Sequence, residues 1–216
     1  MMEGNDHPES IGFSKSRFEA LTDGIFAFAM TLLVLGLAVP AGGTIRTSTG
    51  LVEALMGLFP DFIHYVIAFF ILHGMWVSHH VLSRRMAFID RRFLEINLWL
   101  LMAICLIPFT TSFSGDFEDI SLAAVVLEAN LLVVGGVLLL QWQYVARTPR
   151  LLSPEFTPAG LAVGMRKTAV TPAVSVLGIA LALLGFTWST AVYLLIPVIF
   201  WAMKTPRLRR EPEREG

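Results

Sequence analysis

Six long apolar stretches most constrain what this 216-residue chain can fold into. A bilayer core about 30 Å thick needs roughly 20 mostly apolar residues per helical span. Charged residues make up only 15 % of the chain, whereas a soluble domain carries about 25 %. The pattern therefore predicts an all-α polytopic membrane protein with six transmembrane helices per subunit. The expected spans are residues 18–39, 52–76, 93–113, 120–145, 168–186 and 188–203, the last two forming a helical hairpin or, alternatively, one broken helix.

Basic residues indicate the orientation of these spans. With six spans, 15 of the 16 lysines and arginines fall on one side of the membrane, and only Arg46 falls on the other. Because cytoplasmic loops are enriched in Lys and Arg, we expect both termini to be cytoplasmic. The expected location is the cell inner (plasma) membrane, in a multi-pass arrangement. The acidic N-terminus lacks the basic region of a cleavable signal peptide, so the first span is expected to be retained.

The chain is expected to divide into three parts. Residues 1–16 are predicted to be a cytoplasmic N-terminal segment, residues 17–204 a six-helix transmembrane domain, and residues 205–216 a charged cytoplasmic tail. The single cysteine, Cys105, lies inside an apolar run and is expected to be a small buried hydrophobe.

An acidic residue lies inside the first apolar stretch. Asp23 follows Arg17 by six residues, which places it about 9 Å deeper at about 1.5 Å per residue. A carboxylate at such a depth is costly unless it is paired or hydrogen-bonded. At roughly 100° per residue, Asp23 lies about 140° from Phe28 around the helix and Thr22 about 120° from it on the other flank. Asp23 is therefore expected to face the helix bundle and to anchor the first helix there.

The opposite face of this helix is an apolar stripe with one hydroxyl. Its members lie within about 60° of Phe28 around the helix: they are Phe28, Thr31, Leu32 and Leu35, continued below by Leu21 and Gly24. Such a stripe is typical of a packing face, and it can also line a permeation pathway. If the helix lines a pathway, these side chains form its wall and Asp23 does not touch the ion.

Histidines at the end of the second stretch are candidate partners for Thr22 and Asp23. His79 and His80 are expected near the depth of Asp23, so a histidine could donate a hydrogen bond to it. A metal site is an alternative, but adjacent histidines on a helix diverge, and no HExxH or Cys-rich spacing accompanies them. We therefore expect neither a metal nor a cofactor.

Several other polar residues fall inside the apolar stretches: Asp61, His64, Asn97, Glu128 and Asn130. Asp61 follows a proline near the outer end of the second stretch, where it can be solvated. Glu128 lies about a third of the way into the fourth stretch, and both a cross-helix pair and a vestibule remain open for it.

Ordered motifs in the first half of the chain resemble the prokaryotic transmembrane protein 175 family, homologues of the lysosomal potassium channel. The matching residues are Arg17, then Leu21-Thr22-Asp23, then the run from Gly24 to Leu35, then Trp76-Val77-Ser78-His79-His80, Asn97-Leu98 and the segment Ile107-Pro108-Phe109-Thr110-Thr111, which is expected to end the third helix. The second half of the chain matches only as a three-helix hydropathy pattern.

The resemblance implies a homotetramer in which the first helix of each subunit lines a central potassium-permeable pore. Narrow hydrophobic layers would map onto Phe28, Leu32 and Leu35, with Thr31 as a hydroxyl layer. An anchoring motif would consist of Arg17, Leu21, Thr22, Asp23, Trp76, His79 and His80, bonded between neighbouring helices. The implied partners are potassium ions, the lipid bilayer and further copies of the chain, with no nucleic acid.

Three positions depart from the family pattern. Leu21 and Thr22 stand where Phe and Ser are usual, so Thr22 keeps the hydroxyl while Leu21 lacks the aromatic ring. Phe28 stands where an aliphatic side chain is commoner, and four phenyl rings would narrow the pathway. Conductance and selectivity are therefore expected to differ from those of relatives.

Two other classes of function remain as alternatives. A proton-coupled secondary transporter could use Asp23, Glu128 and the histidines, although paired broken helices with midplane Gly and Pro are not evident. A membrane enzyme would need converging catalytic groups, and a lone acid with two diverging histidines provides no nucleophile and base. A passive cation channel with a hydrophobic gate is the leading interpretation, and no TVGYG-like filter is present.

Overall fold

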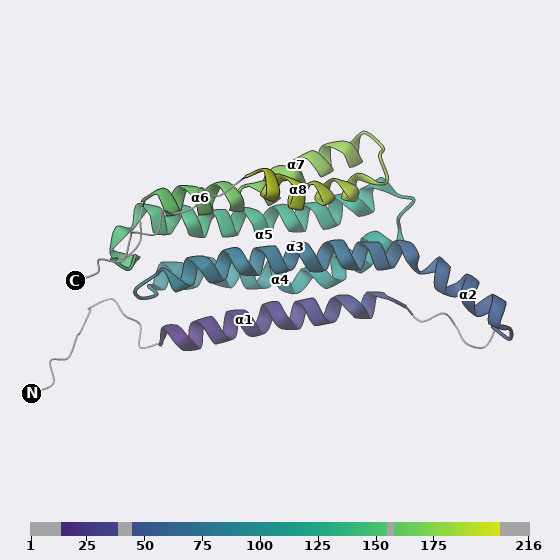
Figure 1. Ribbon diagram of the computed structural model, residues 1–216, viewed down its shortest axis with the longest axis horizontal. Helices are drawn as coiled ribbons and strands as arrows, with labels where there is room; N and C mark the ends of the chain where they lie inside the picture. The colour runs from purple at the N-terminus through teal and green to yellow at the C-terminus, as the bar shows by residue number, and fades with distance from the viewer. Residues whose placement is uncertain (1–13, 39–44, 155–157, 204–216) are drawn as a thin grey trace, which may run out of the picture.

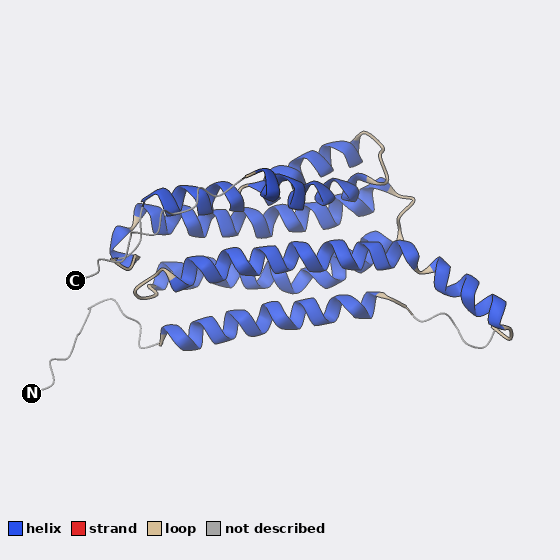
Figure 2. Cartoon of the chain, viewed as in Figure 1, coloured by secondary structure: helices blue, strands red, loops and turns tan. Residues whose placement is uncertain are grey.

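Long helices lie side by side through the computed structural model, which describes residues 14–38, 45–154 and 158–203 (Figure 1). In chain order they are α1 (Lys15–Leu32), η1 (Leu33–Gly36), α2 (Ser48–Gly57), α3 (Phe59–Arg84), α4 (Arg91–Asp116), α5 (Ser121–Arg147), η2 (Pro149–Leu151), α6 (Pro158–Thr168), α7 (Val170–Leu183), η3 (Ser189–Leu194) and α8 (Leu195–Ala202), where η marks a 3₁₀ helix. Among the described residues the β pairing is limited to one isolated bridge between Met86 and Leu152 (Figure 2). The predicted all-α class is confirmed for this part of the chain.

Five segments are long and apolar enough to cross a membrane, which supports a multi-pass membrane protein. They are Lys15–Gly36, Phe59–Arg84, Arg91–Asp116, Ser121–Arg147 and Ala159–Leu183. The predicted sixth span is not confirmed among the described residues, because the last apolar helix, Ser189–Phe200, is shorter. Its 3₁₀ turn and α8 together reach about 24 Å at roughly 2.0 and 1.5 Å per residue, less than the bilayer core of about 30 Å.

The predicted second span, residues 52–76, combines parts of two helices. The helix breaks at Leu58, where α2 ends and α3 begins. Pro60 lies in the first turn of α3, where a missing amide hydrogen costs nothing. None of the residues of α2 is buried, and α2 projects beyond the rest of the bundle at one end (Figure 1). The span therefore starts at Phe59 and continues past the predicted end to Arg84.

Pro108 lies inside α4, so the expectation that this segment ends the third helix is wrong. The helix continues to Asp116. Proline removes one intrahelical hydrogen bond. The Thr110 hydroxyl lies 3.1 Å from the carbonyl oxygens of both Leu106 and Ile107, and it accepts from Asn130 Nδ2 at 3.2 Å. These bonds hold the turn around Pro108 and join α4 to α5.

The sharp turn after α7 is made by Gly185. Its φ of +91° is the left-handed conformation that favours glycine. The Gly185 amide donates to Ala182 O at 2.9 Å and the Phe186 amide to Leu181 O at 3.1 Å, the paired bonds that close a helix C-terminus. The chain then returns along α7 as η3 and α8. The predicted hairpin of the last two apolar segments is present. Its turn is at Gly185, two residues before Thr187, which separates the two predicted spans.

α5 lies in the middle of the bundle and packs most extensively on α4 and α7, while α1 contacts α3 and α4 at one edge (Figure 1). The fifth candidate span begins nine residues before the predicted start, at Ala159 rather than at residue 168, because α6 precedes α7 and joins it at Ala169. The largest fully buried side chains include Trp142 on α5, Phe93 in the first turn of α4 and Phe26 on the inward face of α1.

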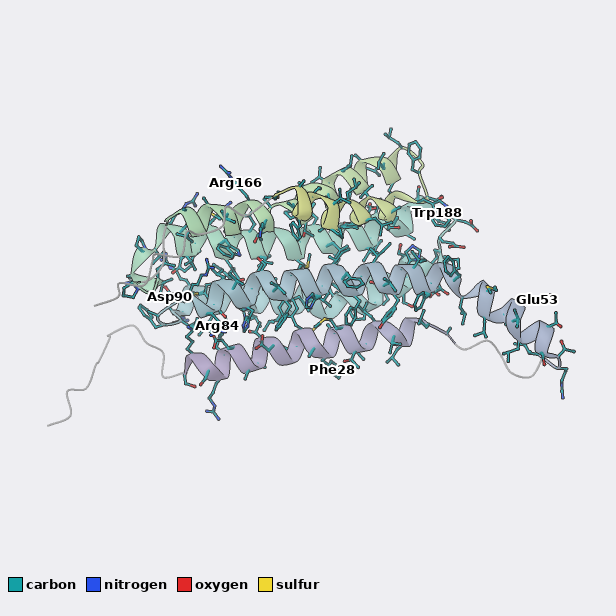
Figure 3. The ribbon with its side chains drawn as sticks, in the orientation of Figure 1. Phe28, Glu53, Arg84, Asp90, Arg166 and Trp188 are labelled. Carbon is teal, nitrogen blue, oxygen red and sulfur yellow. The ribbon has the colours of Figure 1, made fainter. Side chains whose placement is uncertain are left out.

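The two ends of the bundle differ in charge. The start of α1, the end of α3, the start of α4 and the end of α5 meet at one end, with Arg84 and Asp90 there and Glu53 and Trp188 at the other (Figure 3). Ten of the eleven described basic residues belong to the first of these ends by their place in the sequence, and Arg46 to the second. The expectations for residues 1–13 and 204–216, including the charged tail, lie outside the described residues.

Candidate functional site

α1 has one face inside the bundle and one face outside it. Ser14 caps its first turn by accepting from Arg17 N at 3.4 Å. The inward side chains recur at helical spacing and pack toward α3 and α4: they are Phe18, Thr22, Phe26, Ala29 and Leu33. This packing fixes the rotation of α1 about its own axis, and hence the residues that face outward.

The predicted apolar stripe faces outward. Phe28 is 65 % exposed and Leu35 74 %, Thr31 is exposed, and Leu32 is half-buried at the edge of the stripe. Phe28 points away from the remainder of the chain (Figure 3). The stripe is thus not used to pack this chain against itself, so it is available to lipid, to another copy or to a pathway.

Thr31 is the one hydroxyl on this stripe. Its Oγ1 donates to Ala27 O at 2.8 Å, four residues earlier on the same helix. Because its hydrogen is directed into the helix, the hydroxyl oxygen presents its free lone pairs on the exposed face. One turn below Phe28, Gly24 has open space where a Cβ would stand.

Asp23 is anchored by an indole. Trp76 Nε1 on α3 donates to Asp23 Oδ1 at 2.8 Å, and the Trp76 ring lies between His73 and His80, with ring centroids 5.6 and 5.3 Å away. Of the partners expected for Asp23, the tryptophan of the anchoring motif is the one present, and no histidine donates to this carboxylate among the described residues. His80 stacks on Trp76 instead, because residues four apart on a helix lie one above the other.

A buried amide joins Thr22 to three other helices. Asn97 Nδ2 on α4 donates to Thr22 Oγ1 at 3.1 Å, and Asn97 Oδ1 accepts from His79 Nε2 on α3 and Gln141 Nε2 on α5, each at 3.0 Å. All four side chains are buried. An amide has both donors and acceptors, so Asn97 connects α1, α3, α4 and α5 at one level.

The sequence predicted only part of this network. Thr22 and His79 were expected to anchor the helix, whereas Asn97 appeared only as one of several polar residues and a motif match, and Gln141 was missed. The available signal was a lone amide in an apolar helix, since such groups usually hydrogen-bond across helices. Sequence spacing alone does not reveal which helices they join.

Arg17 does not contribute a side-chain bond to the anchor within the described part of the chain. Its side chain is exposed, and its backbone amide donates to Ser14 Oγ at 3.4 Å. Lys15 takes the role instead: its Nζ donates to Met86 O at 2.6 Å and lies 3.7 Å from Glu19 Oε1. These contacts join the first turn of α1 to the connection between α3 and α4.

Three further expectations are settled by burial. Cys105 is exposed, so it is not a buried hydrophobe. Asp61 lines a cavity of about 400 Å³ at the end of the bundle opposite the arginines. Glu128 is fully buried, and neither carboxylate oxygen has a hydrogen-bond partner; among the described residues it therefore forms no cross-helix ion pair. No group of three His, Cys, Asp or Glu side chains that could hold a metal is present in those residues.

Comparison with known sequences identifies relatives along most of the chain. Residues 17–108 match the family described as endosomal/lysosomal potassium channel TMEM175. A protein of Streptomyces collinus named as a potassium channel is 34 % identical over 156 residues, covering 69 % of this chain and 74 % of the relative. A potassium channel of Chamaesiphon minutus is 29 % identical over 187 residues, covering 85 % of this chain and 92 % of the relative.

Solved structures share the arrangement of helices. A crystal structure of a lysosomal potassium-selective channel TMEM175 homolog from Chamaesiphon minutus superposes with a TM-score of 0.75 at 25 % identity, covering 88 % of this chain and 98 % of that chain. A variant of the potassium channel MtTMEM175 superposes with a TM-score of 0.60 at 16 % identity, covering 93 % and 95 %, and shows the fold alone.

Proposed function

The chain belongs to the endosomal/lysosomal potassium channel TMEM175 family, and from this premise we propose that it is a potassium-permeable channel whose pore is lined by the first helix of four subunits. The relatives are named as channels rather than enzymes, and we propose no enzymatic activity. The potassium ion is the permeant species, and the bilayer and other copies of the chain are its partners.

The pore assignment rests most strongly on the two faces of α1, one of which bonds to the bundle while the other stays exposed. Thr22 and Asp23 bond inward to Asn97 and Trp76, while Phe28 and its neighbours on the stripe stay exposed. A helix anchored by its polar side chains can present an apolar wall without exposing a carboxylate to the ion.

The proposed gate is a hydrophobic constriction. Side chains of Phe28, Leu32 and Leu35 from four subunits would form apolar layers, with Thr31 supplying a ring of acceptor oxygens. Such a constriction closes by dewetting and discriminates ions by the energy needed to strip their water. Since potassium loses water more readily than sodium, a modest potassium preference follows.

A single chain supports this assignment because α1 lies at the edge of its own bundle (Figure 1). A pore lined by α1 therefore requires further copies of the chain around it. Most soluble homo-oligomers have closed symmetry, and by the same reasoning we propose a tetramer in which the exposed stripe of α1 faces the symmetry axis.

The charge distribution supports an orientation. Nearly all described basic residues lie at the end of the bundle where α1 begins, so the positive-inside rule places that end in the cytoplasm. We propose that residues 1–16 and 205–216 are cytoplasmic, that residues 17–204 form the channel domain in the inner membrane, and that α8 with its 3₁₀ turn completes an even number of crossings.

Flux from potassium-loaded liposomes tests the function. The reconstituted full chain should release potassium down its gradient when only a proton shunt is supplied to balance charge, and release should stop without the shunt. A proton-coupled transporter would instead require a proton gradient and move potassium against its own gradient. Electroneutral release that persists without the shunt would contradict a channel.

A further inference from the structure

Among the described residues, Glu128 is a buried carboxyl that lies outside the proposed potassium pathway. Glu128 on α5 is 0 % exposed, and both its oxygens lack a hydrogen-bond partner. Unlike Asp23, which has the Trp76 indole, it lies among neutral groups on α7 and η3. It is not part of the α1 stripe or of the Asn97 network.

The surroundings of Glu128 are close-packed and uncharged. A Cβ built on Gly178 of α7 would lie 2.7 Å from Glu128 Oε1, so the backbone of α7 approaches the carboxyl directly. The Ser189 hydroxyl on η3 lies beside the carboxyl and is itself buried without a hydrogen-bond partner. Tyr193 on η3 is close enough for the Glu128 carboxyl to act on it electrostatically, and the Tyr193 hydroxyl donates to Ser175 Oγ at 2.8 Å.

Electrostatics then restricts the form that this carboxyl takes. An ionised carboxylate buried without a counter-charge or hydrogen bonds costs several kcal/mol or more, and buried acids generally become neutral instead. The Ser189 hydroxyl can donate to either form of the acid, so the burial of the carboxyl without a counter-charge decides which form is favoured. The described surroundings therefore favour the acid with its proton bound.

A polar route leads from Glu128 to the end of the bundle opposite the arginines. Thr190 follows Ser189 on η3, and its Oγ1 lies 3.5 Å from His64 Nε2 on α3. A cavity of about 60 Å³ is lined by His64, Ser114 and Thr190 together with Glu118. A buried water needs roughly 10–15 Å³ of such volume and two to four polar partners, so this cavity can hold water beside His64.

His64 stands between this route and the outer cavity. Its Nδ1 has no hydrogen-bond partner and lies on the side of Gly115 and Asp61. Both of those residues line the cavity of about 400 Å³, whose carboxylates are Asp61, Asp116, Glu118 and Asp119. One ring nitrogen thus lies toward this cavity, here called the acidic mouth after its four carboxylates, and the other lies toward Thr190. This is the arrangement required of a histidine that relays protons.

We propose that Glu128 is a proton-binding site inside the second half of the bundle, loaded from the acidic mouth through His64. A proton from the water of the large cavity binds His64 Nδ1 while Nε2 releases its own proton toward Thr190 and the water of the small cavity, so the ring changes from its Nε2–H to its Nδ1–H tautomer. The Ser189 hydroxyl gives its proton to the Glu128 carboxylate, forming the O–H bond, and takes a proton from the water of the small cavity. The ring returns to its first tautomer when the proton travels back along the same path. This site goes beyond potassium permeation and does not depend on it.

Infrared spectroscopy of the full chain in lipid nanodiscs reads this proton directly. At neutral pH, wild-type protein should show a C=O stretch of a protonated carboxylic acid that is lost in Glu128→Gln. The matched control is Glu95→Gln, because Glu95 is exposed and paired with Arg91 at 3.1 Å; it should keep the band. A Glu128→Gln spectrum that still contains the whole band overturns the proposal.

Transfer into heavy water tests the route. Deuteration shifts the acid band, and its rate should fall several-fold in His64→Phe, which keeps a ring but removes both nitrogens. An unchanged rate overturns loading through His64. If Glu128→Gln does not fold, ¹³C-glutamate labelling of wild type replaces it, since Glu128 is the only buried glutamate in the described part of the chain; an acid band that does not shift with this label overturns the site.

Discussion

Asp23 shows how one residue can carry a family signature without contacting the ion. Its carboxylate accepts from the Trp76 indole at 2.8 Å, and the half-buried side chain lies on the flank of α1 that packs on α3. Asp23 faces the bundle as expected, and of its expected partners Trp76 donates to it whereas no histidine does among the described residues. In the proposed channel, Asp23 therefore anchors α1 and does not contact the ion.

Removing either partner of this bond should weaken the bundle. Asp23→Ala leaves the indole N–H without an acceptor, and Trp76→Phe leaves the carboxylate without a donor, each costing about 1 kcal/mol as typical for an interhelical bond in a membrane. Both variants should melt earlier and lose oligomer on size-exclusion chromatography in detergent. Asp23→Asn keeps an acceptor oxygen and is the matched control; equal melting of all three variants would refute the anchor.

Phe28 is the residue at which conduction should respond most. Phe28→Ala removes the largest exposed side chain of the stripe and widens the proposed constriction, so potassium flux in liposomes should rise several-fold and relative sodium permeability should rise with it. Val34→Ala is the control on the same helix, about 120° from Phe28 around the axis. Unchanged flux in a well-folded Phe28→Ala protein would remove Phe28 from the pathway.

At the scale of helices, close approach by glycine joins the second half of the bundle. A Cβ on Gly164 of α6 would overlap the Trp142 ring of α5. That ring is also held by its Nε1, which donates to Ser78 Oγ on α3 at 3.1 Å, and Ser78 in turn lies 2.6 Å from Thr168 Oγ1. Gly164 thus allows one indole to link α3, α5 and α6.

Gly164→Ala should therefore destabilise the protein more than an alanine elsewhere. The added methyl must displace a packed indole, and overpacking of this kind costs about 1–3 kcal/mol. Gly136→Ala is the matched control, because open space surrounds the site of its Cβ. Thermal unfolding in detergent measures the difference. A melting temperature for Gly164→Ala equal to that of Gly136→Ala would contradict the packing described.

Local signals in the sequence predicted helix positions well where hydropathy changed abruptly and poorly where it did not. The break at Leu58 lies inside a continuous apolar run, so averaging over 20 residues merged α2 with α3. Pro108 looked like a helix end, yet Thr110 and Asn130 stabilise the turn around it. The α8 region was assigned as a span from hydropathy alone, since its 3₁₀ turn and short length are not visible in composition.

At the scale of the whole chain, the predictable part of the site was the rotation of α1. Helical spacing alone placed Phe28 and Leu35 on one face and Asp23 on another, and both faces are as expected. The Asn97 network and the surroundings of Glu128 could not be predicted in this way, because they depend on which distant helices become neighbours. Gln141 meets Asn97 across 44 positions of sequence.

In the proposed channel, the exposed stripe of α1 faces the ions in the assembled protein. A cysteine at Thr31, in a chain whose native cysteine is removed by Cys105→Ala, places one reactive thiol on that stripe. Val34→Cys in the same background places it on the flank. Both thiols can then be treated with a small cationic thiol reagent, which reacts only where water reaches.

Potassium flux through these two variants, measured before and after the reagent, is the most direct test. The proposed pore predicts that modification at Thr31→Cys abolishes flux, that potassium ions slow the reaction there, and that flux through Val34→Cys continues. Undiminished flux after Thr31→Cys has reacted completely, or equal block at both positions, would show that the stripe is not the pore wall.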